Sequence, residues 1–149
     1  MCARARFLAR QAGITCIRLM AVAPTMSTSL DVDIPRDRQA PYHARRAVED
    51  LGDAIAPEIR GDVVLLVSEL VTNSVKYGDA GSVKLQIQAP SPRKLRVEVV
   101  NEGSSFTPVA RDRPKTDVGG WGLHLVETLT DRWGVHAGST HVWFEIDRA

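Results

Sequence analysis

The order in which two hydrophobic periodicities follow one another constrains the fold of this chain more than any other feature. Patterns typical of half-buried strands occur at 30–34, 82–88, 95–100, 133–136 and 141–146. Patterns typical of helices with one buried face occur at 41–56, 63–77 and 121–131. The order β-α-α-β-β-α-β-β predicts a two-layer α+β sandwich, with about three helices on one face of a mainly antiparallel sheet.

Length and composition agree with one globular domain. The chain has 149 residues, of which 44% are hydrophobic and 25% charged, so it can bury a sizeable core. A formal net charge of +1 offers no basic surface for direct nucleic-acid binding, and no apolar run is long enough for a membrane span. Both cysteines, Cys2 and Cys16, precede the body of the chain, so we expect no disulfide framework and a cytoplasmic location.

Residues 1–28 are set apart from the domain predicted for 29–149. This segment is basic and partly apolar, which superficially resembles a secretory signal. However, Gln11 and Arg18 interrupt its apolar stretch. We therefore expect a disordered or amphipathic extension, with Met26 as an alternative start of the chain.

Three polar side chains share one stripe of the helix expected at 63–77. Helical spacing places Glu69, Asn73 and Lys76 within about 60° of one another, opposite the apolar residues. A solvated helix face is the ordinary interpretation of such a stripe. A carboxamide oxygen also suits Mg²⁺ and an ammonium group suits phosphate, so the stripe is a candidate ligand site.

Two further features favour a ligand near the ends of a strand and a helix. Asn101 ends an apolar strand, and Gly103 allows a ligand to approach the backbone closely, although an ordinary turn explains both residues as well. Gly120 and Gly122 begin the helix expected at 121–131, where free N–H groups attract anions. No spacing of histidine, aspartate and cysteine matches a zinc pattern.

In this order, the three clusters resemble the GHKL (Bergerat-fold) ATP-binding domain, particularly the small serine-kinase anti-sigma factors of bacteria. The resemblance covers roughly residues 30–147. The stretch 69–78 is similar to the N box of that family, 120–126 to its second glycine box, and 142–145 to its last strand.

The resemblance implies a role for each matching residue. Asn73 would coordinate the Mg²⁺ that bridges the ATP phosphates, and Glu69 would act as general base on the serine hydroxyl of a partner protein. Lys76 would lie near the phosphates, and Asn101 would read the adenine. The remaining nucleotide-binding residues would be Gly103 against the base, Gly120, Gly122 and Leu123 at the phosphate-binding helix start, and Thr140 near the adenine.

The first glycine box departs from the family pattern Asp-x-Gly-x-Gly, because residues 101–105 read NEGSS. A hydrogen bond to a neutral group contributes about 0.5–1.5 kcal/mol, against about 1.5–3 kcal/mol for a charged one. We therefore expect Asn101 to bind ATP roughly tenfold more weakly than an aspartate would. Ser105 also replaces the last glycine, at the start of an expected ATP lid over 103–119 whose cations would be Arg111, Arg113 and Lys115.

The resemblance implies an ATP-dependent protein-serine kinase of the anti-sigma type, with ATP and Mg²⁺ as cofactors. Its expected partners are a sigma factor and an anti-anti-sigma protein that it phosphorylates, and a homodimer is a further expectation. A non-catalytic, ATP-gated binding module is the alternative, and a structural domain without nucleotide is the third. We do not expect a histidine kinase, because no dimerisation helix with a phosphoacceptor histidine precedes the domain.

Overall fold

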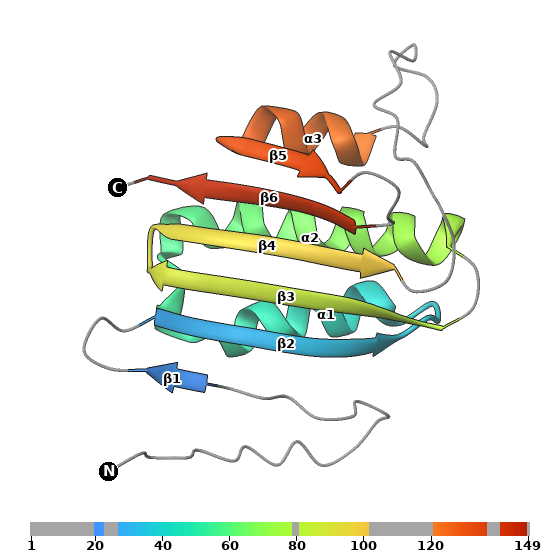
Figure 1. Cartoon of the computed structure of the whole chain (residues 1–149), viewed down its shortest axis with the longest axis horizontal. Helices are drawn as coiled ribbons and strands as arrows, with labels where there is room; N and C mark the ends of the chain where they lie inside the picture. Colours follow the sequence, from blue (N-terminus) through green and yellow to red (C-terminus); the bar gives the residue numbers. More distant parts are fainter. Residues whose placement is uncertain (1–19, 23–26, 79–80, 102–120, 137–140, 149) are drawn as a thin grey trace.

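The computed structural model describes residues 20–22, 27–78, 81–101, 121–136 and 141–148. In these residues, one six-stranded sheet carries α-helices on one face, and its opposite face is uncovered (Figure 1). The predicted two-layer α+β sandwich is therefore confirmed.

The sheet is antiparallel at every described strand pair, in the order β1-β2-β3-β4-β6-β5. Strand β6 therefore lies between β4 and β5, although β5 precedes it in the chain. Five strands correspond to segments predicted from the sequence, and β1 is additional, since it lies within residues 1–28 and pairs with β2. The bounds are β1 Met20–Val22, β2 Ser27–Pro35, β3 Ser82–Ser91, β4 Lys94–Asn101, β5 Arg132–Val135 and β6 His141–Asp147.

The helical layer consists of three α-helices and one 3-10 turn in the described ranges. Helix α2 packs against α1, α3, β3 and β4. None of the described helices combines the length and the apolar character that a membrane crossing requires. The bounds are α1 Ala40–Asp50, the 3-10 helix η1 Gly52–Ala54, α2 Pro57–Tyr77 and α3 Trp121–Leu129.

The first helix is shorter than predicted. The pattern predicted a helix over 41–56, but α1 ends at Asp50. Gly52 follows in the left-handed region with a φ of 50°, which costs a glycine little because it has no Cβ. The chain then makes the turn η1 and buries Ile55 in the core.

The second helix is longer than predicted. The pattern predicted a helix over 63–77, but α2 begins at Pro57, and Gly61 lies within it. The preceding Ala56 is extended. Proline suits the first turn of a helix because the N–H that it lacks has no helical partner there. The result is a helix of 21 residues, which crosses the inner face of the sheet.

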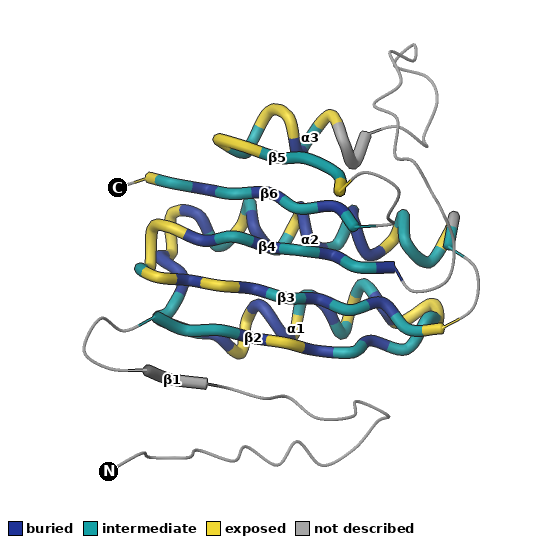
Figure 2. The backbone as a smooth tube through the Cα atoms, in the orientation of Figure 1, coloured by how far each residue is buried: buried dark blue, intermediate teal, exposed yellow. Residues whose placement is uncertain are grey.

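The core lies between the helices and the inner face of the sheet (Figure 2). Alternate residues of the long strands are buried, as their period of two predicted. Burying one large apolar side chain contributes about 1.5–3 kcal/mol, so this packing holds the strand ends and the helix ends in fixed positions. The largest fully buried side chains include Ile34, Ile55, Leu66, Leu85 and Phe144.

Candidate functional site

The C-terminal ends of β2, β4 and α2 meet at one end of the molecule, at the right in Figure 1. The strand register explains the first two, because Ile34 of β2 lies opposite Val83, and Val83 lies opposite Asn101 of β4. The helix end joins them because Arg36, just after β2, donates a hydrogen bond to the carbonyl oxygen of Ser74. Asn101 is thus brought to the end of the helix that carries the polar stripe.

The predicted polar stripe lies on α2. Glu69 and Asn73 are half-buried and Lys76 is exposed, whereas Leu70 and Val71 are buried in the core. The stripe therefore runs along the border between the helical layer and solvent. A carboxylate and a carboxamide oxygen one helical turn apart, both partly shielded from water, are suited to hold a hard cation or to accept a proton.

Asn101 is the only polar side chain in the buried class among the described residues, with 4% of its surface exposed. A buried carboxamide requires hydrogen-bond partners, and Arg36 supplies one by donating from Nη2 to the side-chain oxygen of Asn101. The same guanidinium donates from Nη1 to the carbonyl oxygen of Ser74 and from Nε to the carbonyl oxygen of Gly81, at 3.4 Å. Arg36 therefore ties together the ends of β4 and α2 and the residue before β3.

Gly78 makes this close packing possible. It caps the C-terminus of α2, and its φ of −84° is accessible to any residue. A Cβ at this position would collide with the guanidinium of Arg36 and with the carboxamide of Asn101. Glycine here allows the close approach of these two side chains, which a larger residue would have to displace, and it is not needed for the backbone conformation.

Sequence reasoning missed Arg36. A single arginine after Pro35 gives no local signal, because most arginines on a protein surface are solvated. The available signal was indirect: Arg36 lies two residues beyond the inward-facing Ile34, so it continues the buried face of β2. Only the register across two strand pairs places it beside Asn101.

The bond from Arg36 changes what Asn101 can offer to a ligand. An amide oxygen has two lone pairs, and one of them accepts the hydrogen bond from Arg36. The amino group of a bound adenine would therefore have to share the side-chain oxygen of Asn101 with the guanidinium of Arg36. This adds a second reason, beyond the lost negative charge, to expect weak reading of adenine at this position.

The other predicted site residues are only partly covered by the structure. Gly122 and Leu123 lie in the first turn of α3, where the phosphate-binding helix start was predicted, and α3 packs against α2. The residues outside the described ranges are Gly103, Gly120, Thr140 and the expected lid at 103–119 with Arg111, Arg113 and Lys115.

Ion pairs occupy the uncovered face of the sheet. Arg96 donates to Glu98 at 2.6 Å and to Glu145 at 2.8 Å, and its guanidinium lies 4.2 Å from the ring centroid of Trp143. Burial acts to raise the pKa of Glu98, but hydrogen bonds from Arg96 and His141 outweigh it and hold that pKa below its usual value. These charged groups are therefore mutually satisfied.

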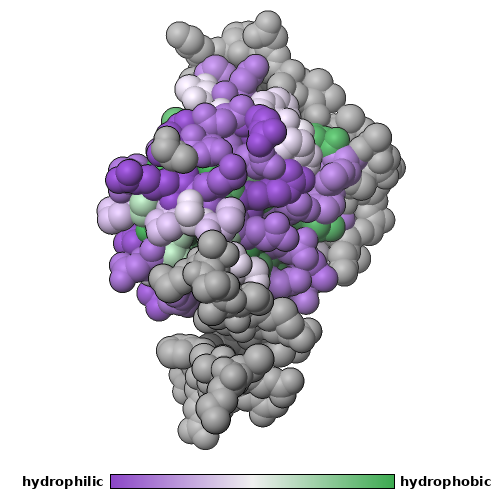
Figure 3. Space-filling model, turned by 60° about the vertical axis from the view of Figure 1, so that its left-hand side comes forward, coloured by the Kyte–Doolittle hydropathy of each residue, from purple (hydrophilic) through white to green (hydrophobic). Residues whose placement is uncertain are grey.

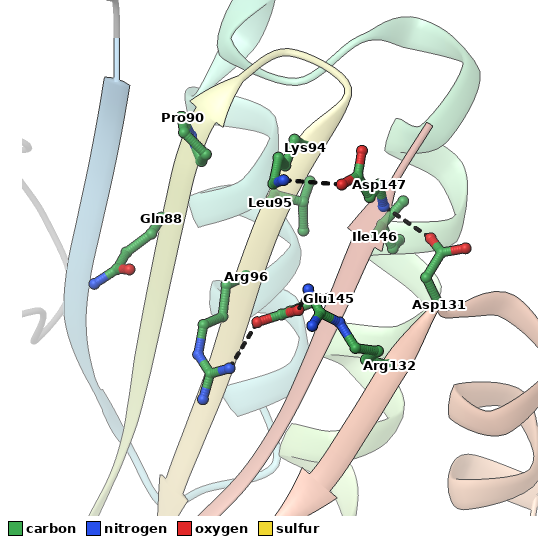
Figure 4. A pocket seen from close by; sticks show the side chains of 10 residues that line it. All are labelled: Gln88, Pro90, Lys94, Leu95, Arg96, Asp131, Arg132, Glu145, Ile146 and Asp147. Atoms are coloured by element: carbon green, nitrogen blue, oxygen red, sulfur yellow. Dashed lines mark hydrogen bonds and ion pairs between the residues drawn. The ribbon is translucent and has the colours of Figure 1, made fainter. Parts of the chain in front are cut away.

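A hollow of about 190 Å³ lies at the end of the sheet where β4 begins, the left-hand end in Figure 1, and Figure 4 shows its lining from close by. Its charged lining is already paired, since Lys94 lies 2.9 Å from Asp147, and Asp131 accepts the backbone N–H of Asp147 at 2.8 Å. Seen from this side, the described surface is mostly hydrophilic (Figure 3). The hollow is at the opposite end of β4 from Asn101, so it does not belong to the candidate site.

Comparison with known families gives an independent result. The family model described as a histidine kinase-like ATPase domain matches residues 35–146, from the last residue of β2 to the next-to-last residue of β6. This range includes every residue assigned above to the candidate site. A comparison with curated proteins found no match.

Proposed function

This chain belongs to the family of histidine kinase-like ATPase domains, the GHKL class, and on that premise we propose that it is an ATP-dependent protein-serine kinase of the anti-sigma type. The observation that carries the proposal is on α2. A half-buried carboxylate, Glu69, precedes a half-buried carboxamide, Asn73, by one helical turn on the same polar stripe. Phosphoryl transfer from a magnesium nucleotide to a hydroxyl uses one group that accepts the proton and another that holds the ion, and these two side chains suit those roles.

The residues present fit a magnesium nucleotide by the chemistry of their donors. Asn73 offers a neutral oxygen ligand of the kind that Mg²⁺ accepts, and it would hold the ion together with phosphate oxygens. When bound, the ion supplies neutralisation of the phosphate charge. Lys76, exposed one turn nearer the end of α2, adds a positive charge on the same stripe.

The start of α3 would hold phosphate. The first N–H groups of a helix have no partner within the helix, and they carry the positive end of its dipole. Gly122 lies in this first turn, and α3 packs directly against α2. The phosphate-binding turn and the polar stripe therefore belong to neighbouring helices of one layer.

Glu69 would act as the general base. It would accept the proton of a serine hydroxyl while the serine oxygen forms a bond to the γ-phosphorus, and ADP would leave with the electron pair of the broken bond. We propose an anti-anti-sigma protein as the donor of that serine, and a sigma factor as the second partner. The cytoplasm is the compartment that this role requires.

The test separates nucleotide binding from transfer. Calorimetric titration of the full chain with ATP is run with and without Mg²⁺, and candidate anti-anti-sigma proteins are incubated with γ-labelled ATP. We expect Asn73→Ala to abolish magnesium-dependent binding. We expect Glu69→Gln to bind normally but to lose serine labelling. Thr72→Ala, on the exposed face of the same helix, is the matched control. Serine labelling that persists in Glu69→Gln contradicts the assigned base.

A second candidate function is an ATP-gated binding module without catalysis. The contact between Arg36 and Asn101 favours it, because a cation already engages the oxygen that would read the base. Such a module would bind Mg-ATP through Asn73 and change its affinity for a partner, but it would label no serine. The same two experiments therefore distinguish the kinase from the binding module.

A further inference from the structure

Two histidines face each other on the uncovered side of the sheet, away from the polar stripe of α2. His141 begins β6, and His136 follows the last residue of β5. The backbone N–H of His136 donates to the carbonyl oxygen of His141 at 3.1 Å, so the two residues are opposite one another across the strand pair. Their rings lie edge to face, with centroids 4.5 Å apart.

A carboxylate from a third strand completes this cluster. Glu98 of β4 lies opposite Trp143, two residues beyond His141 on the same face of β6. One oxygen of Glu98 contacts Nε2 of His141. One ligand atom from each of Glu98, His136 and His141 lies within 4.8 Å of the other two. The sequence could not show this, because the three residues come from β4, from the start of β6 and from the position just after β5, and they share no motif.

The two oxygens of Glu98 have different partners. Oε1 accepts from Arg96 at 2.6 Å, whereas Oε2 faces His141. A hydrogen bond from a neighbouring group is how proteins orient a carboxylate ligand. The positive charge of Arg96 opposes a bound cation, but Arg96 also pairs with Glu145 at 2.8 Å, and this carboxylate balances part of that charge.

We propose that Glu98, His136 and His141 bind one divalent transition-metal ion, with Zn²⁺ as the best match. Two imidazole nitrogens and one carboxylate oxygen suit zinc, whereas Mg²⁺ prefers oxygen ligands alone. Zinc ligands lie about 2.0–2.2 Å from the ion, so their atoms are roughly 3.4 Å apart in a tetrahedral site. On binding, Nε2 of His141 and the Glu98 oxygen would exchange their direct contact for bonds to the ion and move apart to about this separation, and water completes the coordination.

Binding would join the β5–β6 pair to β4. The ion would connect three strands through side chains at one end of the sheet. Because the unfolded chain does not hold these three residues together, the ion stabilises the folded state by an amount that rises with the logarithm of its concentration above the dissociation constant. The proposal does not depend on the nucleotide site, since none of its ligands belongs to that site.

The experiment uses the full chain in a background of Cys2→Ser and Cys16→Ser, because these thiols would also bind zinc. The protein is treated with a chelator and titrated with ZnCl₂ alone by calorimetry, and its melting temperature is measured with and without Zn²⁺. We expect one ion per chain. We expect His136→Gln and Glu98→Gln each to weaken binding at least tenfold and to remove the rise in melting temperature.

His124→Gln is the matched control, because His124 is exposed on α3, outside the cluster. Substitution by Co²⁺ gives a second readout, since its visible spectrum reports a site of nitrogen and oxygen ligands. Binding that is equally strong in His136→Gln and in the parent overturns the proposal. So does loss of binding in His124→Gln, or the absence of stoichiometric binding in a folded parent, which would leave Glu98 and His141 as an ion pair only.

Discussion

Arg36 donates a hydrogen bond to the side-chain oxygen of Asn101, although 65 positions separate the two residues in the sequence. The contact fills the point where the ends of β2, β4 and α2 meet. It places a cation beside Asn101, the position at which the family pattern has an aspartate. The first four of the following predictions concern this contact.

Asn101→Asp should strengthen ATP binding about tenfold, because a hydrogen bond to a charged acceptor contributes more than one to a neutral acceptor. The carboxylate would accept from Arg36 with one oxygen and keep the other for the amino group of adenine. Calorimetric titration with Mg-ATP measures the change. An unchanged dissociation constant would show that Asn101 does not read the base.

Arg36→Ala should destabilise the folded protein by about 1–3 kcal/mol, because it removes the hydrogen bonds that one guanidinium donates to Asn101, Ser74 and Gly81. Urea unfolding gives the free energy of unfolding. Arg38→Ala is the control, since Arg38 is exposed nearby. Equal stability of the two variants would show that the contact does not hold the strand and helix ends together.

Although Arg36→Ala should lower the stability of the protein, it should raise its affinity for nucleotide. If Arg36 competes with adenine for the oxygen of Asn101, Arg36→Ala should bind Mg-ATP about twofold to tenfold more tightly, which corresponds to one neutral hydrogen bond. The titration is done well below the melting temperature of the variant. Weaker binding would instead indicate that Arg36 contacts the nucleotide itself.

Gly78→Ala should destabilise the protein by about 1–3 kcal/mol, because the added methyl group would collide with Arg36 and Asn101. Gly61→Ala is a control within the same helix. A Cβ at Gly61 meets no atom within 4 Å, so this substitution should stabilise the helix by about 0.5–1 kcal/mol. Opposite signs in urea unfolding are expected, and two stabilising substitutions would contradict the crowding at Gly78.

Acid should destabilise the protein partly through Glu98. Its folded-state pKa is lowered, so its contribution is fully present above the unfolded value of about 4.3 and is lost as the pH falls through the folded value. Unfolding measured with a chelator present should depend less on pH below about 4.3 in Glu98→Gln. Arg96 on its own strand and His141 on β6 contact Glu98, and His136, just after β5, has a ring nitrogen within 4.8 Å of it. Glu145 of β6 is linked to Glu98 through Arg96.

Glu49→Gln is the control for this pH dependence. Glu49 pairs with Arg46 at 3.4 Å, but both side chains are about half exposed, so the pair contributes little. Its substitution should leave the acid limb of the stability curve unchanged. An equal change in both variants would show that general charge, rather than the pairing of Glu98, determines the acid response.

Local patterns were sufficient for most of the fold. The period of two identified five of the six strands, because each long strand buries one face and exposes the other. Helix boundaries were less accurate. The helix predicted over 63–77 extends back to Pro57 and includes Gly61, because the packing of α2 against α1 and the sheet outweighs the small cost of one glycine within a helix.

The sequence alone determined the elements of this protein and the polar stripe of Glu69, Asn73 and Lys76, because helical and strand periods are local properties. The tertiary structure decided which residues stand beside Asn101 and which side chains cluster on the uncovered face. Arg36 reaches Asn101, and Glu98 reaches His141, only through the register of strands that are distant in sequence. Register depends on how all the buried faces pack together, so no single segment of the chain encodes it.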